Sequence, residues 1–139
     1  MAEISPGIQR VVAVLDEHRT ALDAAQLMSE RFIGSVVVTR AARVVGIFTE
    51  RDLMRRVVAA RRDPAGVHLA EVMREDLVAV APNESVQRCL ELMKEHRSRH
   101  LPVYDGDEFV GVVSLRDLVA LMLDEKERLI QELTRYITS

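Results

Sequence analysis

Hydrophobic and polar positions follow two periods along this chain, which predict short strands and amphipathic helices. Apolar, mainly β-branched runs at residues 11–15, 35–39 and 44–48 predict three strands. Apolar residues at helical spacing predict a helix over residues 20–31, opened by a capping box at Thr20 and Asp23 and closed by Gly34. A second helix is expected over residues 49–60, and residues 4–9 are expected to be irregular.

The same order of elements returns in the second half of the chain. An extended segment at residues 77–80 precedes a helix over residues 86–96 and a strand over residues 100–104. Asp105, Gly106 and Asp107 form a strong hairpin signal before a partner strand at residues 108–113. The last helix is expected to start at Ser114 and to reach residue 137. Between the halves, a charged stretch with Pro and Gly at residues 61–66 reads as a linker, and residues 69–74 are expected to form a helical turn.

The two halves are copies of one pattern. They align without gaps at an offset of 65 residues, which places GIFTERD at residues 46–52 over GVVSLRD at residues 111–117. A fixed offset with a shared hydrophobic pattern indicates a duplicated unit. Each half is too small to bury both faces of its sheet, so the halves are expected to pack on each other about a pseudo-twofold axis.

Both aligned motifs place a hydroxyl residue where a strand runs into a helix, with an aspartate three positions later. These pairs are Thr49 with Asp52 and Ser114 with Asp117. A helix start presents unpaired backbone N–H groups and the positive end of the helix dipole, so it attracts anions. The same residues also form ordinary capping boxes, and from the sequence both interpretations stay open.

Composition and charge narrow the function classes. The chain has 139 residues, 48% of them hydrophobic, and a net charge of −3, which does not favour nucleic acid or an anionic membrane as partner. We expect no signal peptide, because no basic region precedes a long apolar run, and no apolar run approaches the ~20 residues that span a bilayer. The single Cys89 lies on an apolar helical face and is expected in the core of a cytoplasmic protein.

Metal and catalytic chemistry find little support in the sequence. His96 and His100 are four residues apart, but the helix is expected to end between them and no Cys or carboxylate pattern completes a site, so no metal is predicted. No nucleophile–base set and no phosphate-cradling Gly-rich loop is found, so no catalytic residue and no enzyme activity are predicted.

The order strand, helix, strand, strand, helix, the motifs GIFTERD and GVVSLRD, and RHLPVYD at residues 99–105 together resemble a tandem pair of cystathionine-β-synthase (CBS) domains, the Bateman module. The resemblance spans about residues 8–122. It implies an α/β (α+β) fold of two β-α-β-β-α repeats: repeat 1 at residues 8–62, a linker at 63–72, repeat 2 at 73–123 and a C-terminal helical extension at 124–139.

The resemblance implies adenosine-ligand sites in two clefts, for AMP, ADP or ATP and in some members S-adenosylmethionine or NAD. It implies that Asp52 and Asp117 accept hydrogen bonds from ribose hydroxyls, while Thr49, Ser114 and the helix starts favour phosphate. The adenine is expected against the extended segments. The aliphatic residues concerned are Val12, Val78 and Val80, with Val36 and Leu101 behind them.

The second repeat matches the family pattern better than the first. Basic residues before the Leu-Pro-Val strand bind phosphate in this family, and Arg99 and His100 stand there. For the first cleft three outcomes stay open: it is empty, it takes a nucleoside, or it borrows basic groups across the pseudo-twofold. Arg51 and Arg116, beside the aspartates, are the candidate lenders, and Arg116 is also counted among the ligand-binding residues. In the first repeat Gly34 and Ser35 occupy the basic positions, so the second cleft is expected to be the better nucleotide site.

The last helix extends beyond the second repeat with an apolar face. Leu118, Met122, Leu129, Leu133 and Ile137 recur near helical spacing among charged residues. Because CBS pairs usually pair again, we expect this helix at the interface of a homodimer.

The sequence thus predicts a stand-alone regulatory module that senses an adenosine nucleotide and signals its state to an unidentified protein partner. No cofactor is required in this interpretation, and neither nucleic acid nor membrane is a partner. The alternative is a non-catalytic dimerisation module, or scaffold, whose ligand clefts are degenerate.

Overall fold

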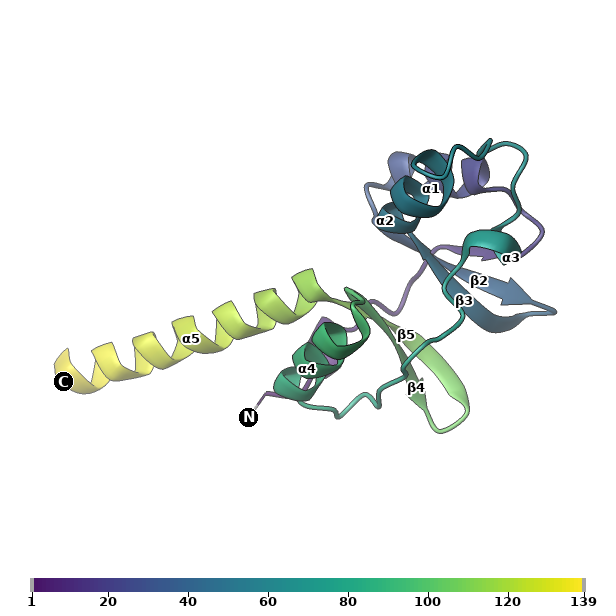
Figure 1. Cartoon of the computed structure of the whole chain (residues 1–139). Coiled ribbons are helices and arrows are strands. Elements are labelled where there is room, and N and C mark those ends of the chain that lie inside the picture. The colour runs from purple at the N-terminus through teal and green to yellow at the C-terminus, as the bar shows by residue number, and fades with distance from the viewer. Residues whose placement is uncertain (1, 139) are drawn as a thin grey trace. The chain divides into compact units, whose positions relative to one another are not determined.

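The structure is a computed structural model that describes residues 2–138, and these residues form two compact units (Figure 1). The central unit is Val11–Leu77, and the terminal unit combines residues 2–10 with residues 78–138. These two units are defined by which residues pack together. The predicted repeat boundaries, 8–62 and 73–123, describe the duplication in the sequence instead, and they stay predictions. Each unit has a mixed α/β architecture, as the duplicated pattern predicted, and each contains a hydrophobic core of its own.

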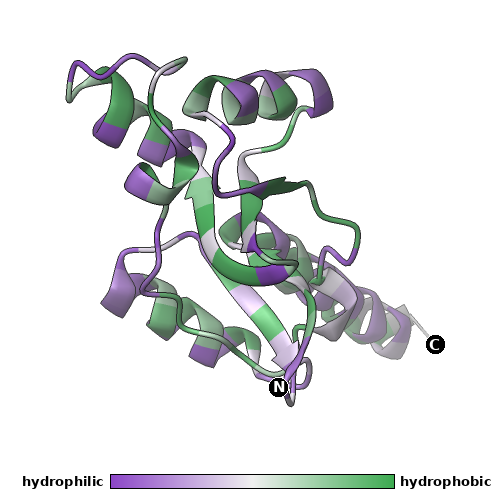
Figure 2. Ribbon diagram, turned by 90° about the vertical axis from the view of Figure 1, so that its right-hand side faces the viewer, coloured by the Kyte–Doolittle hydropathy of each residue, from purple (hydrophilic) through white to green (hydrophobic). Residues whose placement is uncertain are grey.

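The central unit contains a three-stranded sheet in the order β1 (Val14–Asp16), β2 (Ser35–Arg40), β3 (Arg43–Thr49). β1 runs parallel to β2, and β2 runs antiparallel to β3. The helical elements of this unit are α1 (Ala21–Arg31), α2 (Glu50–Asp52), η2 (Leu53–Val58) and α3 (Leu69–Val72). The strands are mostly hydrophobic and the helices mix hydrophobic with hydrophilic residues (Figure 2), so the helices bury one face only.

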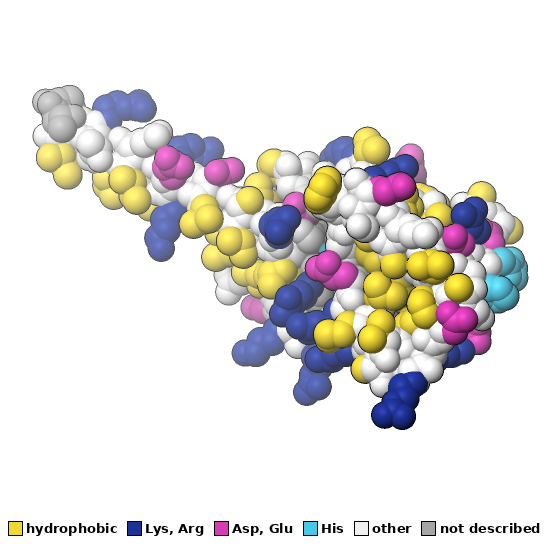
Figure 3. Space-filling view, turned by 90° about the horizontal axis from the view of Figure 1, so that it is seen from above, with side chains coloured by type: hydrophobic (Ala, Val, Ile, Leu, Met, Phe, Trp, Pro, Cys, Tyr) yellow, Lys and Arg dark blue, Asp and Glu magenta, His cyan; other side chains and the backbone are white. Residues whose placement is uncertain are grey.

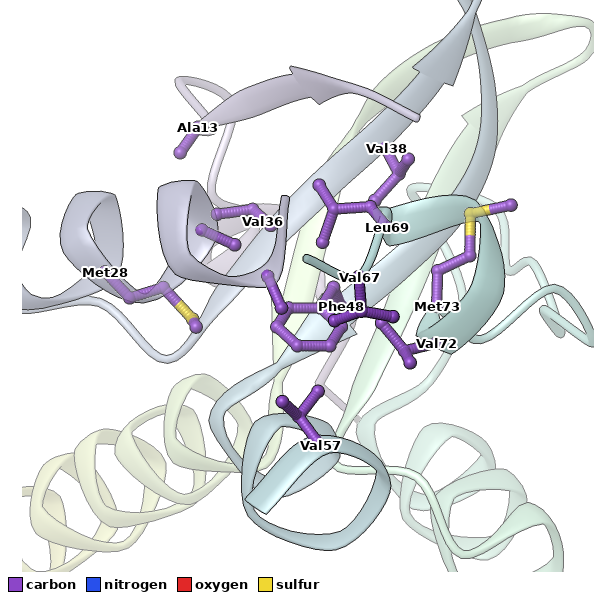
Figure 4. Packing of buried hydrophobic residues seen from close by; sticks show 12 residues of the cluster. Ala13, Met28, Val36, Val38, Phe48, Val57, Val67, Leu69, Val72 and Met73 are labelled. Carbon is purple, nitrogen blue, oxygen red and sulfur yellow. The ribbon is translucent and has the colours of Figure 1, made fainter. Parts of the chain in front are cut away.

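The core of the central unit lies between its sheet and its helices. Phe48 of β3 is fully buried, and Val57 of η2, Met28 of α1 and Val72 of α3 lie in the same cluster (Figure 4). These side chains come from four elements that are separated along the sequence, so their packing holds the elements of the central unit together. Fully burying each such side chain stabilises the unit by about 1.5–3 kcal/mol before entropy is counted.

Helix α1 begins as predicted and ends differently. The N–H of Asp23 donates to the Thr20 hydroxyl at 3.1 Å, and the N–H of Thr20 donates to the Asp23 carboxylate at 3.0 Å. Arg19 also donates to that carboxylate, and this bond is the main reason that the pKa of Asp23 falls to about 2. The predicted Gly34 cap is wrong, because Phe32 takes the left-handed conformation (φ 53°) and ends the helix there. The next residue, Ile33, donates its N–H to the Met28 carbonyl and packs against the core.

The first strand is shorter than predicted and lies further along the chain. The apolar run starts at Val11, but that side chain is 96% exposed and pairing with β2 begins only at Val14. The run was typical of a strand, but a strand needs a neighbour, and the residues of this segment that pair with β2 are 14–16. The predicted strands at residues 35–39 and 44–48 are confirmed as β2 and β3.

The helix predicted over residues 49–60 is helical, but most of it has a wider hydrogen-bond pattern. After α2, the N–H of Ala59 bonds to the Met54 carbonyl at 2.8 Å and that of Arg62 to the Val57 carbonyl at 2.9 Å. Both bonds span five residues, which is the π-helical pattern. The segment predicted as a linker at residues 63–72 contains α3 and contributes buried side chains to the core.

The terminal unit repeats the same plan with a two-stranded sheet. Its elements are η1 (Ser5–Gly7), α4 (Val86–His96), β4 (His100–Asp105), β5 (Glu108–Ser114) and α5 (Leu115–Thr138). β4 and β5 are antiparallel, and Val80 adds a single parallel bridge to Val103 of β4. Cys89 of α4 is fully buried, as predicted, and burial raises the pKa of its thiol to about 11.

The first residues of the chain pack into the core of the terminal unit, which the prediction of an irregular lead missed. Ile4 is fully buried and donates its N–H to the Glu84 carbonyl at 2.9 Å. Gln9 and Val112 exchange backbone hydrogen bonds of 2.8 and 3.0 Å. Ile47 and Arg74, at the equivalent positions of the other repeat, form the same pair in the central unit.

Helix α5 leaves its unit after the first two turns. Leu115, Leu118 and Leu121 pack against the terminal core, and the residues after them are exposed. The helix then continues to Thr138 as a single long element (Figure 1). Over residues 2–138, no helix combines the length and the hydrophobicity that crossing a membrane requires.

Candidate functional site

Each unit contains one strand–helix junction with the predicted hydroxyl–aspartate pair. In the central unit, the N–H and the hydroxyl of Thr49 donate to Asp52 Oδ2 at 3.0 and 2.9 Å, and the N–H of Asp52 donates to Thr49 Oγ1 at 3.1 Å. In the terminal unit, Ser114 and Asp117 make the same three bonds at 2.8, 2.8 and 3.1 Å. Both junctions are therefore capping boxes, and a ligand role for the same residues stays a prediction.

Strand register places the predicted basic residues beside the terminal junction. His100 is the direct pairing partner of Ser114 across the β4–β5 sheet. The carbonyl of Arg99 accepts the N–H of Leu115, the first residue of α5, at 2.8 Å. The side chain of Arg99 is exposed and that of His100 is half-buried. The structure thus brings Arg99 and His100 to the strand–helix junction that Ser114 and Asp117 form.

Arg116 occupies the first turn of α5, next to Asp117, and is exposed. A cation at this end of the helix adds to the attraction that the helix start exerts on an anion. Its predicted role as a phosphate ligand stays a prediction.

The central junction has the same backbone but different side chains. Gly34 and Ser35 stand where Arg99 and His100 stand in the other unit, and Ser35 pairs with Thr49. The Glu50 carboxylate lies over Gly34, where an added Cβ would be 3.4 Å from Oε1. An acidic group therefore stands at this junction in place of the basic residues of the other unit, which disfavours a phosphate here.

Asp52 is also less exposed to solvent than Asp117, its counterpart in the second repeat. It is only 8% exposed, and Arg56 Nε lies 3.8 Å from its Oδ1 atom. Arg56 is held in place because its Nη1 atom donates to the carbonyls of Val72 and Met73 at 3.3 and 3.0 Å. The position of Arg56 corresponds to Leu121 in the second repeat, so Asp117 has no such cation on its own helix.

Asp117 instead contacts a residue from the far end of the chain. Gln9 Nε2 donates to Asp117 Oδ2 at 3.0 Å and lies 3.3 Å from Oδ1. The backbone of Gln9 is fixed by its pairing with Val112. Sequence reasoning missed Gln9, because the pair is 108 residues apart and no local pattern connects them. Only its equivalence to Arg74 at the offset of 65 marks the position.

The predicted aliphatic wall residues lie in or near the two cores. Val36 is fully buried in the central core, while Leu101 and Val80 are buried in the terminal core. Val78 is half-buried against the terminal core and Val12 is half-buried in the central unit. Val36 and Leu101 are therefore structural residues first, and contact of any of the five with adenine stays a prediction.

Clusters suited to a metal ion are not found in the described part of the chain. No group of three or more His, Cys, Asp or Glu side chains there is arranged to hold one. His18 and His68 make an edge-to-face ring contact at 6.3 Å, but they do not gain a third ligand.

Comparison with known proteins matches both halves of the chain to one family. The family model of the CBS domain matches residues 3–59 and again residues 69–124. The mitochondrial CBS domain-containing protein CBSX3 of Arabidopsis thaliana is 32% identical over 123 residues, which cover 85% of this chain and 60% of that protein. The CBS domain-containing protein YhcV of Bacillus subtilis is 33% identical over 118 residues, covering 85% of this chain and 84% of that protein.

The fold agrees with these matches. The crystal structure of the CBS-domain containing protein ATU1752 from Agrobacterium tumefaciens superposes with a TM-score of 0.76 at 31% identity and covers 81% of this chain and 90% of that one. The chain spans less than two thirds of the Arabidopsis relative and most of the two bacterial ones.

Proposed function

Because this chain belongs to the CBS-domain family, whose members are generally regulatory and ligand-binding rather than catalytic, we propose that it binds an adenosine nucleotide and signals the ligand state to a partner protein. The ligand is AMP, ADP or ATP, and the site is the terminal junction around Ser114 and Asp117. The chain acts without a catalytic step and without a required cofactor. A cytoplasmic location and a homodimeric state belong to the same proposal.

The observation that carries the proposal is the set of charges at the terminal junction. Arg99 and His100 stand beside the N-terminus of α5, where the helix dipole, the guanidinium of Arg99 and an N–H of the His100 imidazole favour a phosphate together. The Asp117 carboxylate carries acceptor lone pairs that suit the two hydroxyl donors of a ribose cis-diol. The central junction offers Glu50 and a paired Asp52 instead, so the terminal junction is the preferred site.

Substitution of the two aspartates tests the proposal. Isothermal titration of AMP into the wild type is expected to show binding, and Asp117→Ala is expected to weaken it about 10- to 100-fold, the value of one or two hydrogen bonds to a charged group. Asp52→Ala is the matched control, because it removes the equivalent capping box and is expected to leave AMP affinity within about twofold. Absence of any heat at millimolar nucleotide, or equal effects of the two substitutions, would contradict the proposal.

A thermal-shift panel identifies the nucleotide. A ligand that binds only the folded state raises the melting temperature by mass action. AMP, ADP and ATP are expected to give larger shifts than S-adenosylmethionine and NAD. A larger shift with either of the latter two would replace the assigned ligand class.

A scaffold without ligand is the second candidate, and one observation favours it. Both aspartates already have a partner within their own chain. Gln9 donates a hydrogen bond to Asp117, and Arg56 forms an ion pair with Asp52. Under this alternative no nucleotide shifts the melting temperature, while the assembly with a protein partner persists. The calorimetric titration of AMP into the wild type and the two aspartate variants separates the two candidates.

A further inference from the structure

One helical stretch of the central unit carries a concentration of positive charge. Five arginines fall between residues 51 and 62, which belong to α2, η2 and the turn after them. Lys and Arg side chains are not spread evenly over the surface of the molecule, and several of them gather in one group in the space-filling view (Figure 3). In a chain with a net charge of −3, a local group of cations favours an anionic partner.

Two of the five arginines are held within the central unit. Arg56 donates to two backbone carbonyls of the segment that follows α3, and Arg62 donates to the Glu71 carboxylate at 2.8 Å. The other three have exposed side chains that form no hydrogen bond or ion pair with any residue the structure describes: Arg51, Arg55 and Arg61. Their guanidinium groups are available to carboxylates from outside the unit.

Exposed apolar side chains lie in the same stretch. Met54 is 54% exposed and Val58 is 62% exposed. They are four residues apart, as are Arg51 and Arg55, so an apolar row runs along the helix beside a basic row. Val57 is fully buried in the central core and fixes the side of the helix that faces solvent. We call the following residues the η2 face: Arg51, Met54, Arg55, Val58 and Arg61.

The η2 face is a feature of the first repeat alone. At the offset of 65 residues, Arg55 and Arg62 correspond to Ala120 and Glu127 of α5. The hydrogen bonds of η2 follow the π-helical pattern, whereas Leu115–Thr138 is a regular α-helix. Short π-helical turns are rare and occur frequently at functional sites. The duplication therefore does not explain the η2 face, which indicates a role that belongs to the central unit.

We propose that the η2 face docks an amphipathic helix of another protein, whose apolar side packs on Met54 and Val58 and whose bordering carboxylates pair with the three free arginines. Guanidinium groups bind carboxylates in a bidentate geometry, and methionine adapts its shape to an apolar neighbour. The partner's role in signalling rests on the proposed function, but docking itself needs no nucleotide at the terminal junction.

The same residues disfavour nucleic acid as the occupant. Nucleic acids are bound chiefly by neutralising many phosphates in a row, and the η2 face offers three free cations. Glu50 and Asp63, both exposed, stand at the two ends of the stretch, where they would repel a continuous phosphate backbone. Met54 and Val58 would gain nothing from phosphate contacts, whereas an amphipathic helix buries them.

A second copy of the η2 face and a lipid surface fit less well than a foreign helix. Two η2 faces placed together would bring unpaired arginines against unpaired arginines, and like charges at short distance repel. Helices that lie on membranes bury a large apolar face, and the η2 face carries two exposed apolar side chains.

Fluorescence anisotropy with a labelled synthetic peptide tests the docking on the nucleotide-free protein. The probe is a peptide of Leu, Ala and Glu, about 15 residues long so that a helix can form, with leucines along one side and glutamates at both borders. Saturable binding with a Kd below about 100 μM is expected. A second peptide of the same charge, with serine in place of every leucine, is expected to bind about tenfold more weakly, because it leaves the apolar row uncovered.

Charge reversal on the η2 face is the matching change in the protein. The double variant Arg55→Glu, Arg61→Glu is expected to weaken peptide binding at least about tenfold, and to keep its fold because both side chains are exposed and unpaired. The control is Arg43→Glu, Arg128→Glu, which changes the net charge by the same amount at exposed positions of β3 and α5. Its affinity for the peptide is expected to stay within about twofold.

Several results would overturn the proposal. No saturable binding up to about 1 mM peptide is one, and equal binding of the two peptides or equal affinities of the two double variants is another. Tighter binding of oligouridine or of phosphatidylserine vesicles than of the leucine peptide would assign the face to a different partner. So would a wild-type dimer that binds no peptide and that Met54→Glu, Val58→Glu converts to a monomer in light scattering.

Calorimetry with AMP on the same variants keeps this proposal separate from the nucleotide site. Peptide binding without AMP binding contradicts the proposed function and supports docking at the η2 face. AMP binding without peptide binding contradicts the docking and leaves the nucleotide site supported.

Discussion

At the scale of single residues, the two repeats share their capping hydrogen bonds and differ in what else holds the aspartate. Asp52 is paired with Arg56, one turn further along its own helix, whereas Asp117 accepts the amide of Gln9. A cation one turn away is a permanent partner, since it moves with the helix. A neutral amide from another segment is weaker and can be displaced, which makes Asp117 the more accessible carboxylate.

Removing the Gln9 amide is expected to strengthen nucleotide binding at the terminal junction. Gln9 Nε2 takes up the Asp117 oxygens to which ribose hydroxyls would donate, so a ligand must displace it. For Gln9→Ala we expect AMP affinity to rise about two- to tenfold by calorimetry, the value of one partly exposed hydrogen bond. Gln87→Ala, on the exposed side of α4, serves as control. Weaker binding by Gln9→Ala would mean that the amide contacts the ligand instead.

At the scale of elements, each unit receives an extended segment from outside its β-hairpin at the same place. Gln9 pairs with Val112 of β5, and Arg74 pairs with Ile47 of β3. In both cases the strand residue before the pairing position is a glycine, at positions 111 and 46. A side chain at Gly111 would meet the backbone of Gln9, so the close approach of the two segments requires glycine there.

Gly111→Ala is therefore expected to destabilise the terminal unit by about 1–3 kcal/mol, because a methyl group is forced against a backbone carbonyl that cannot rotate away. Chemical denaturation measures this difference. Gly66→Ala is the comparison, since an added Cβ there is no closer than 3.4 Å to the Asp63 side chain, and its effect should stay within about 0.5 kcal/mol. Equal midpoints for the two variants would show that the N-terminal segment shifts at little cost.

At the scale of the whole molecule, the two ends of the chain belong to one unit and the middle belongs to the other. Residues 2–10 cross from the N-terminus into the core that α4, β4 and β5 build. Ile4 has no exposed surface although it lies near the start of the chain. Folding of the terminal unit therefore has to close a long loop, whereas the central unit forms from one continuous stretch.

Ile4→Ala should affect the terminal unit and leave the central unit intact. Truncating a fully buried isoleucine removes about 2–5 kcal/mol through lost burial and the cavity that remains. Native-state hydrogen exchange is expected to show faster exchange in α4, β4 and β5, some 80 or more residues away in sequence, and unchanged rates in β2 and β3. Equally faster exchange in both units would mean that they unfold together.

Local hydrogen bonds and periodic burial were determined by the sequence itself. The capping boxes at Thr20, Thr49 and Ser114 join residues three positions apart, and most strands and helices follow the hydrophobic period. The duplicated plan and the family could be predicted from the repeated motifs. The closeness of Arg99 and His100 to Ser114 and Asp117 could be predicted because the register of a hairpin follows from its turn, while their role in ligand binding stays a prediction.

The tertiary structure decided what depends on neighbours distant in sequence. The left-handed residue Phe32 ends α1 where β2 must begin, and the carbonyls of Val72 and Met73 hold Arg56 beside Asp52. Contact between Gln9 and Asp117 spans 108 residues and has no local signature. These contacts form only when distant segments of the chain pack together, because the partners are close in space and not in sequence. They make the two junctions chemically different although both carry the same motif.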